Sequence, residues 1–236
     1  GLFGYDTIST KLLRRFGKDH MLEAYEKREG NLPLPGYELK TMDVAKKFTD
    51  GFEISSIEIV ANQTGVVDVA TGHPSLTSSL SKSLSSIAMH EVEKHKVAIV
   101  STGKEASNET LSRSLCSIWN CSNAIKEEGL VILLAECKNG LGSEAIQQYI
   151  EGRMSLDRLK NPSKYVDGMD DLLFLTEMRK KFGIGIVSIL PHFFIADKLG
   201  MIPFSGAKDA MDYVLKTYGE RQKIAIVSDG SHVLLR

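Results

Sequence analysis

Residues 130–142 read Leu-Val-Ile-Leu-Leu-Ala-Glu-Cys-Lys-Asn-Gly-Leu-Gly, six apolar residues followed by a polar loop with two glycines. A short apolar run bounded by such a loop is typical of a strand that is buried on both faces. Three similar runs stand between helical patterns, at Val97–Val100, Ile184–Ile189 and Lys223–Ser228. The sequence therefore predicts an α/β fold, a mostly parallel Rossmann-like sheet with helices on both faces.

The part of the chain before this sheet has a different pattern. Residues 1–50 are predicted to be a small helical segment, the remainder of a preceding domain, and residues 51–236 the α/β domain. Within the latter, Ile57–Ala61 and Gly65–Ala70 predict an antiparallel hairpin. A helix is expected next, over about residues 75–94.

Composition excludes several classes of protein. Of 236 residues, 42% are hydrophobic, which is enough for a core, and no run of apolar residues is long enough to span a membrane. The 29 basic and 30 acidic residues give a net charge of −1, which argues against a nucleic-acid partner. Three cysteines cannot all be paired, and no signal peptide is recognisable, so we expect a cytoplasmic protein. The chain begins at Gly1, so we expect either the remnant of a tag or an internal fragment.

The loop after Val100 is the first candidate site. It lies between a buried strand and a helix, where Gly103 allows a tight backbone, Lys104 supplies a cation, and Asn108 or Ser107 can cap the helix. A carboxylate or phosphate would be stabilised at that helix N-terminus. A capped surface loop with a solvated lysine is an equally weighted alternative. The candidate binding residues here are Ser101, Thr102, Gly103, Lys104 and Asn108.

The loop after Ala135 is the second candidate site, with Glu136 and Gly140 as its candidate residues. Glu136 could act as a general base or bind a hydroxyl, and the glycines let backbone amides approach a ligand. The loop carries neither a Walker nor a dinucleotide fingerprint. A tight connection with a capping or ion-paired Glu136 is the alternative. Both loops follow parallel strands, so we expect them at one edge of the sheet.

The helical pattern that runs from Asn108 to about Lys126 carries the third candidate. Arg113 and Cys116 lie opposite its apolar face and could border a cleft, although such residues are more often simply exposed or covered by a neighbouring helix. The apolar face, expected to pack on the sheet, is formed by Leu111, Leu115, Ile118 and Ile125. Histidine and cysteine spacings match no metal motif, so no metal ligand is predicted, and the catalytic residues stay unassigned.

The stretch Ile125–Gly142 resembles a signature of the nickel-dependent lactate racemase family, which carries an apolar strand followed by Ala-Glu-Cys. Shorter matches lie along nearly the whole chain, at Gly1–Ile8, Ala70–Pro74, Lys198–Pro203 and Val227–His232. The resemblance implies a two-domain α/β isomerase that binds a nickel pincer nucleotide. That cofactor would take hydride from the α-carbon of a 2-hydroxy acid and return it to either face.

This sequence also differs from the family at positions that matter for its chemistry. The family's cofactor-bearing lysine and catalytic histidines would precede Gly1, so the partner of this chain would be a preceding N-terminal catalytic domain, and no cofactor is expected on this chain alone. Leu12 stands where the family has a nickel-ligating histidine, and His20 could replace it only if the loop shifted. On the helix after Asn108, three family positions (tyrosine, glutamine and lysine) are occupied by Ser112, Arg113 and Cys116. Arg113 could hold a carboxylate, whereas Cys116 cannot replace a cation at neutral pH.

The leading prediction is therefore the C-terminal portion of a lactate-racemase-like isomerase that acts on a small 2-hydroxy acid. The alternatives are a non-catalytic module of the same fold that binds a small anion or nucleotide, and a half that completes another polypeptide. The sequence leaves open whether the chain is itself an enzyme. It also leaves open the oligomeric state, with a homo-oligomer among the arrangements considered.

Overall fold

The computed structural model describes residues 28–29, 32–33, 47, 49–62, 65–73, 88–103, 106–160 and 165–236. The chain divides into two compact units. The first contains Gly1–Arg28, Leu32–Met89 and Ser163–Tyr165, and the second contains Glu29–Asn31, His90–Pro162 and Val166–Arg236. Each unit is described by itself.

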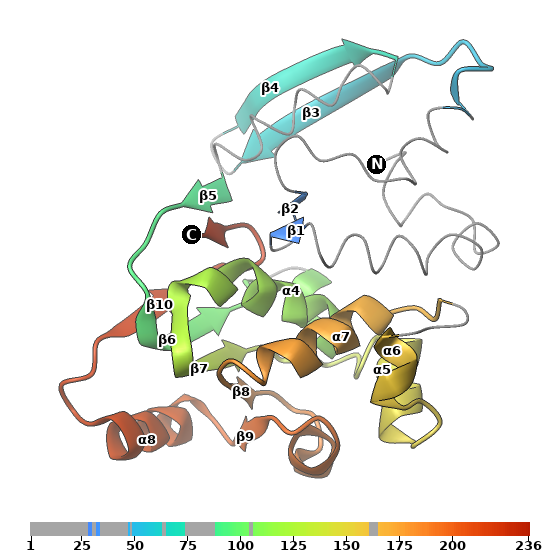
Figure 1. Cartoon of the computed structure of the whole chain (residues 1–236). Helices are drawn as coiled ribbons and strands as arrows, with labels where there is room; N and C mark the ends of the chain where they lie inside the picture. The colour runs from blue at the N-terminus through green and yellow to red at the C-terminus, as the bar shows by residue number, and fades with distance from the viewer. Residues whose placement is uncertain are drawn as a thin grey trace. The chain divides into compact units, whose positions relative to one another are not determined.

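The second unit is built on a five-stranded parallel sheet (Figure 1). The strand order is β10-β6-β7-β8-β9, and every neighbouring pair is parallel. The strands are β6 (His95–Ser101), β7 (Ile125–Leu134), β8 (Gly183–Val187), β9 (Ile202–Phe204) and β10 (Ile224–Val227). The predicted Rossmann-like sheet is confirmed, and its four apolar runs are β6, β7, β8 and β10.

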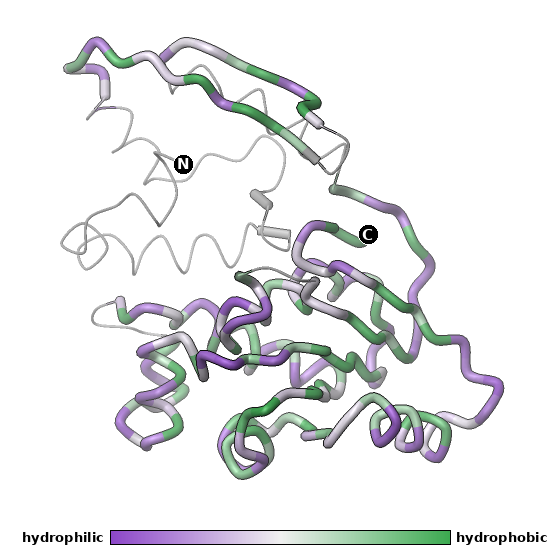
Figure 2. Tube along the Cα trace, turned by 180° about the vertical axis from the view of Figure 1, so that it is seen from behind, coloured by the Kyte–Doolittle hydropathy of each residue, from purple (hydrophilic) through white to green (hydrophobic). Residues whose placement is uncertain are grey.

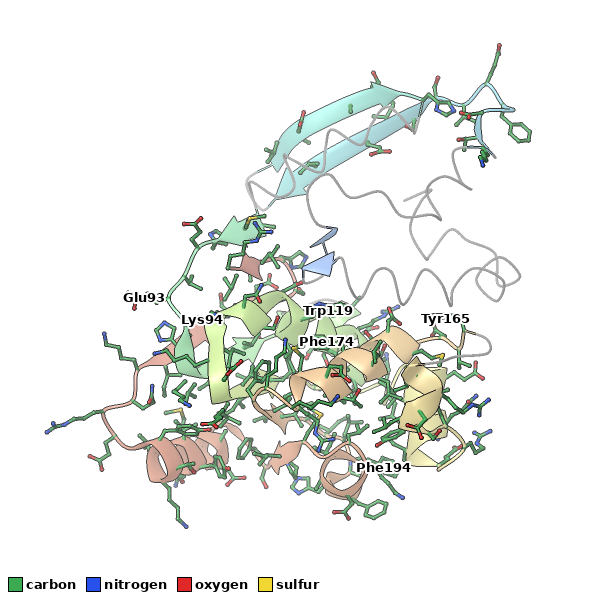
Figure 3. The ribbon with its side chains drawn as sticks, viewed as in Figure 1. Glu93, Lys94, Trp119, Tyr165, Phe174 and Phe194 are labelled. Carbon is green, nitrogen blue, oxygen red and sulfur yellow. The ribbon has the colours of Figure 1, made fainter. Side chains whose placement is uncertain are left out.

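Helices cover both faces of this sheet, which explains why the central parts of its inner strands, Val97–Val100, Leu130–Leu134 and Ile184–Val187, are apolar. On one face lie α4 (Leu111–Cys121) and α7 (Met169–Met178), where Trp119 stacks on Phe174 with 4.7 Å between ring centroids (Figure 3). On the other face lies α8 (Ala207–Tyr218). Its buried residues form one apolar cluster with the strands, made of Val97, Leu130, Ile132, Phe204, Ala210 and Val214.

Short elements connect these layers. They are η3 (Ala106–Asn108), η4 (Ser122–Ala124), α5 (Glu144–Ile150), α6 (Leu156–Lys160) and the π-helix η5 (Phe194–Lys198). A two-residue strand, β11 (Leu234–Leu235), pairs with β5 (Met89–His90). In the part of the chain that the structure describes, no helix has the length and apolar character needed to cross a membrane.

Two predicted helices end earlier than expected. The helix after Asn108 ends at Cys121 instead of Lys126, because η4 follows it and β7 begins at Ile125. Ile125 therefore lies on a strand and not on the helix face. The helix expected over residues 75–94 is wrong at its end, where β5 stands, and residues 74–87 lie outside the described residues.

In the first unit the predicted hairpin is confirmed. Strands β3 (Ser56–Asn62) and β4 (Gly65–Gly72) are antiparallel, with a register shift between Val60 and Ala61. Figure 2 colours much of both strands as hydrophobic. The N-terminal segment is not helical throughout, since β1 (Arg28–Glu29) pairs with β2 (Leu32–Pro33); the rest of the predicted helical segment lies almost wholly outside the described residues.

Candidate functional site

The topology marks one position at the carboxyl edge of the sheet. From β6 the chain proceeds to β7, β8 and β9 on one side, and then returns to β10 on the other side of β6. The direction in which strands are added therefore reverses at β6, and the carboxyl ends of the strands beside such a switch point are where open α/β sheets bind ligands. The loops after β6 and β7 carry most of the predicted site residues.

These two loops are joined by hydrogen bonds, so the expectation that they share one edge is confirmed. The Oδ1 atom of Asn108 accepts from the Glu136 backbone N–H at 2.7 Å, and from the Thr102 hydroxyl at 3.2 Å. The backbone oxygen of Asn108 accepts from Cys137 N–H at 2.9 Å. Further along, Asn139 N–H donates to the Glu109 oxygen at 2.8 Å. Asn108 is thus a clip that fixes one loop on the other.

The expected capping role of Asn108 or Ser107 is wrong. Asn108 belongs to η3, and the cap of α4 is Thr110, whose side chain accepts from the Arg113 N–H. Thr110 has the extended backbone (φ −136°, ψ 156°) that a helix cap requires, so the helix begins only at Leu111. The Ser107 hydroxyl instead donates to the Thr102 backbone oxygen at 3.0 Å.

The first turn of α4 has no spare backbone donors. Leu111 N–H donates to the Gly140 oxygen, and Ser112 N–H donates to the Leu141 oxygen, each at 3.0 Å. With Arg113 N–H bonded to Thr110, the groups that a helix N-terminus normally offers to an anion are already taken. An anion at this point would have to be held by side chains.

The remaining predicted residues differ in accessibility. Thr102 is fully buried, so its side chain supports the loop from the interior of the unit. Cys116 is half-buried. Arg113 and Glu136 are exposed, and the guanidinium of Arg113 lies 3.4 Å from the carboxylate of Glu109. Gly140 has a φ of +81° and open space where a side chain would begin. Lys104 lies outside the described residues.

A cluster after β10 was missed as a site by the sequence reasoning. The carboxylate of Asp229 lies against Gly103, because a Cβ at Gly103 would be only 2.8 Å from the Asp229 Oδ1 atom. Asp229 accepts from the Ser231 hydroxyl at 2.9 Å and lies 3.0 Å from His232 Nδ1. Partial burial raises the pKa of Asp229, but the hydrogen bonds from His232 and Ser231 outweigh it and hold that pKa below its usual value.

Hydrogen bonds hold the loop that carries this cluster against the end of β6. Gly230 N–H donates to the Ser101 oxygen at 2.8 Å, and the Asn120 amide donates to the Gly230 oxygen at 2.8 Å. The Ser101 hydroxyl in turn accepts from Gly103 N–H at 3.2 Å. The available signal was the polar run Ser228–His232 directly after an apolar strand.

A second carboxylate that the sequence reasoning missed lies beside α4. The Ser112 hydroxyl donates to Asp171, a half-buried residue in the first turn of α7. Burial is the main cause that raises the pKa of Asp171 well above its usual value, and the neighbouring charges of Asp170 and Asp167 act in the same direction. Folding therefore makes the protonated form of Asp171 more favourable than it is in the unfolded chain.

No metal centre is found in the described part of the chain, where no three His, Cys, Asp or Glu side chains converge. None of the three cysteines forms a disulfide, and burial raises the pKa of Cys137 to about 11 and that of Cys121 to about 12. Among the described residues, the carboxyl edge thus offers the exposed arginine Arg113, the carboxylates of Glu136 and Asp229, and the imidazole of His232. These groups suit the binding of a small polar anion and proton exchange with it.

Two solved structures resemble this chain in three-dimensional structure. The structure of the lactate racemase apoprotein from Thermoanaerobacterium thermosaccharolyticum matches with a TM-score of 0.67 over 77% of this chain, at 17% identity. The chain shares the fold of part of lactate racemase. A crystal structure of a Thermotoga maritima protein matches with a TM-score of 0.59 over 84% of the chain, at 11% identity.

The chain spans about half the length of both solved structures, 46% of the lactate racemase and 53% of the Thermotoga protein. No family model and no curated protein matches the sequence. The likeness to lactate racemase is therefore one of fold, carried by three-dimensional arrangement at low identity.

Proposed function

We propose that this chain is part of a lactate-racemase-like isomerase, in which it binds the carboxylate end of a small 2-hydroxy acid. The observation that carries the proposal is the likeness of fold to lactate racemase. The loops after β6 and β7, clipped together by Asn108, support it, because they rigidly position α4 at the carboxyl edge of the sheet.

Arg113 is the residue proposed to hold the substrate carboxylate. Its guanidinium is exposed at the first turn of α4, and within the described residues it forms an ion pair with Glu109 alone. A planar guanidinium can present two parallel N–H donors to a carboxylate, which gives both affinity and orientation. Substrate would replace Glu109 as the partner of these donors.

Glu136 is proposed to accept a hydrogen bond from the substrate hydroxyl. Its side chain is exposed, while its backbone is fixed by Asn108 at the N–H and by Ile189 N–H at the oxygen. An exposed carboxylate on a fixed backbone can accept the hydroxyl proton of a bound 2-hydroxy acid. The same loop, through Gly140, leaves room for an approaching ligand.

The family that this fold suggests uses a nickel pincer nucleotide for hydride transfer. The described residues do not fit that group, because they provide no convergent metal ligands. We therefore assign no step through it to these residues. In the proposal, the cofactor and its ligands belong to a preceding domain of the complete protein.

The test is racemisation by the protein extended to its natural N-terminal region and supplied with nickel. A panel of 2-hydroxy acids is assayed by chiral chromatography, comparing the unaltered protein with Arg113→Gln. We expect KM for the best substrate to rise by about tenfold or more, because a charge-assisted contact is lost. Arg158→Gln, an exposed arginine on α6, is the matched control and should leave KM unchanged. Absence of turnover with every acid would refute the proposal.

A non-catalytic anion-binding module is the second candidate. One observation favours it: Cys116, half-buried on α4, stands where the racemase family has a lysine, so a substrate-facing cation is missing. In this case the extended protein binds a 2-hydroxy acid in calorimetry, with Arg113→Gln weakening the affinity, and yet interconverts no enantiomers. A half that completes another polypeptide would gain activity only on mixing with that chain.

A further inference from the structure

A hollow of about 380 Å³ lies at the opposite, amino-terminal edge of the sheet. Its walls come from three separate segments: the residues that lead into β6, the beginning of β7, and the loop between α8 and β10. Figure 3 labels Glu93 and Lys94 on the first of these segments. The charged groups that line it are Lys94, Lys96, Lys126, Arg221, Lys223 and Glu93.

The charge of this hollow is strongly one-sided. Five cations and one carboxylate give it a formal charge of 5 − 1 = +4, although the whole chain carries −1. Within the described residues, none of the five cations forms an ion pair with a carboxylate. Like charges gathered around so small a volume repel one another, and a bound anion would relieve that repulsion.

An irregular backbone builds one wall. His95 pairs with Ile125 and Val97 pairs with Leu130, so β6 advances by two residues while β7 advances by five. The extra residues of β7 form a bulge that carries Lys126 to the hollow. The ammonium group of Lys96 donates to the Glu127 backbone oxygen at 2.9 Å, which holds the bulge against β6.

This bulge requires unusual conformations. Glu128 has a φ of +56°, a region that residues other than glycine rarely adopt, and its N–H donates to the Lys181 oxygen at 2.7 Å. A Cβ at Gly129 would lie 2.6 Å from the Lys96 oxygen, so only glycine fits there. Bulges often re-aim side chains at binding sites, and strain of this kind persists only where the surrounding structure fixes it.

We propose that this hollow binds a compact polyphosphate, the di- or triphosphate group of a small molecule. Its volume lies in the lower part of the range of small-molecule pockets, roughly 300–1,000 Å³. Cations from three segments surround it, and several phosphate groups can engage them at once where one phosphate cannot.

A nucleic acid does not fit the same surface. Protein–DNA interfaces bury about 1,000–2,500 Å² and need basic charge beyond a single hollow. Here exposed carboxylates stand next to the lining residues in the chain, at Glu91, Glu127, Glu128 and Glu220. They would repel an extended polyanion passing over the rim, whereas a compact ligand inside the hollow avoids them.

The test uses inorganic tripolyphosphate as the probe in isothermal titration calorimetry with the 236-residue protein. Two cations of the α8–β10 loop are removed in the double variant Arg221→Gln, Lys223→Gln. We expect affinity to fall by about tenfold for each cation removed. The matched control, Lys198→Gln with Lys208→Gln, removes the same charge from exposed residues outside the hollow and should leave affinity within about twofold.

Two additional arms complete the experiment. The charge-conserving variant Arg221→Lys, Lys223→Arg should keep most of the affinity, and the unfolding temperature of each variant reports on folding independently. Inorganic phosphate should bind more weakly than tripolyphosphate. The proposal is overturned if tripolyphosphate gives no heat of binding, or if the double variant and its control lose equal affinity for it. It is also overturned if a single-stranded oligonucleotide binds more tightly than tripolyphosphate.

Discussion

Replacement of Asn108 by alanine tests whether the clip between the two loops stabilises the sheet edge. The Oδ1 atom of Asn108 is the acceptor for two donors, the Glu136 N–H at 2.7 Å and the Thr102 hydroxyl at 3.2 Å. The two donors differ in their surroundings. Glu136 is exposed, so water can replace the lost acceptor, whereas Thr102 is fully buried and its hydroxyl would lose a partner that water cannot replace.

The magnitude follows from this difference. A bond that water can replace contributes about 0.5–1.5 kcal/mol, and a buried hydroxyl left without a partner costs about 1–3 kcal/mol. Asn108→Ala should therefore lower the free energy of unfolding by about 2–4 kcal/mol. With an m-value near 2 kcal/mol per M, the urea midpoint should fall by about 1–2 M.

The assay is urea unfolding followed by tryptophan fluorescence. Trp119 is the only tryptophan in the chain and stacks on Phe174 inside the α/β unit, so its emission reports on that unit. Asn108→Asp keeps an oxygen acceptor and should lose much less stability. Asn139→Ala, an exposed residue whose backbone N–H makes the loop contact, should stay within about 0.5 kcal/mol of the unaltered protein. An Asn108→Ala midpoint equal to that of the unaltered protein would refute the clip.

Three further outcomes are expected. Gly103→Ala should lower stability by about 1–2 kcal/mol in the same assay, because φ is +81° and the new Cβ would crowd Asp229; an unchanged midpoint would contradict this. Burial raises the pKa of Asp171 in the folded protein above its unfolded value of about 3.9. The folded state is therefore most stable, with respect to this group, below about pH 3.9, and that stability is lost as the pH rises through the folded-state pKa. Asp171→Asn should therefore raise the urea midpoint at pH 7 and leave it little changed at pH 3; a lower midpoint at pH 7 would reverse the sign. Burial raises the pKa of Cys137 to about 11, so Cys137 should react with a thiol reagent at pH 8 more slowly than the half-buried Cys116. Peptide mapping of the labelled protein measures both rates. Equal rates would contradict the burial of Cys137.

The sequence was sufficient for the parts of the fold that depend on local pattern. Each of the four predicted sheet strands contains at least four apolar or glycine residues in succession, and all four are found. The fifth strand, β9, is only Ile202–Phe204 and contains a proline, so nothing distinguished it from a loop. The end of α4 was missed because Ile125 continues the helical spacing of Ile118, although the chain has already entered β7.

The candidate site was predictable in position but not in its interactions. Parallel topology alone places the loops after β6 and β7 at one edge, so Ser101 and Glu136 were expected near each other. Asn108 binds the other loop instead of capping α4. This role depends on a hydrogen bond to Glu136, which is 28 residues away in the chain and so leaves no local pattern around Asn108. Contact of Asp229 with Gly103 depends on β10 lying beside β6, which the order of strands along the chain does not reveal.

The ion pair between Arg113 and Glu109 bears directly on whether Arg113 can bind a substrate. Both side chains are substantially exposed, 58% and 38%, and an exposed helical pair of this spacing contributes only about 0.3–0.5 kcal/mol. A bidentate carboxylate partner contributes about 1.5–3 kcal/mol, so a 2-hydroxy acid would displace Glu109 at little cost. The pair would therefore weaken binding by only about twofold. Because the backbone donors at the start of α4 are occupied, a carboxylate at this end of the helix would have to be held by side chains, and Arg113 is an exposed cation on its first turn.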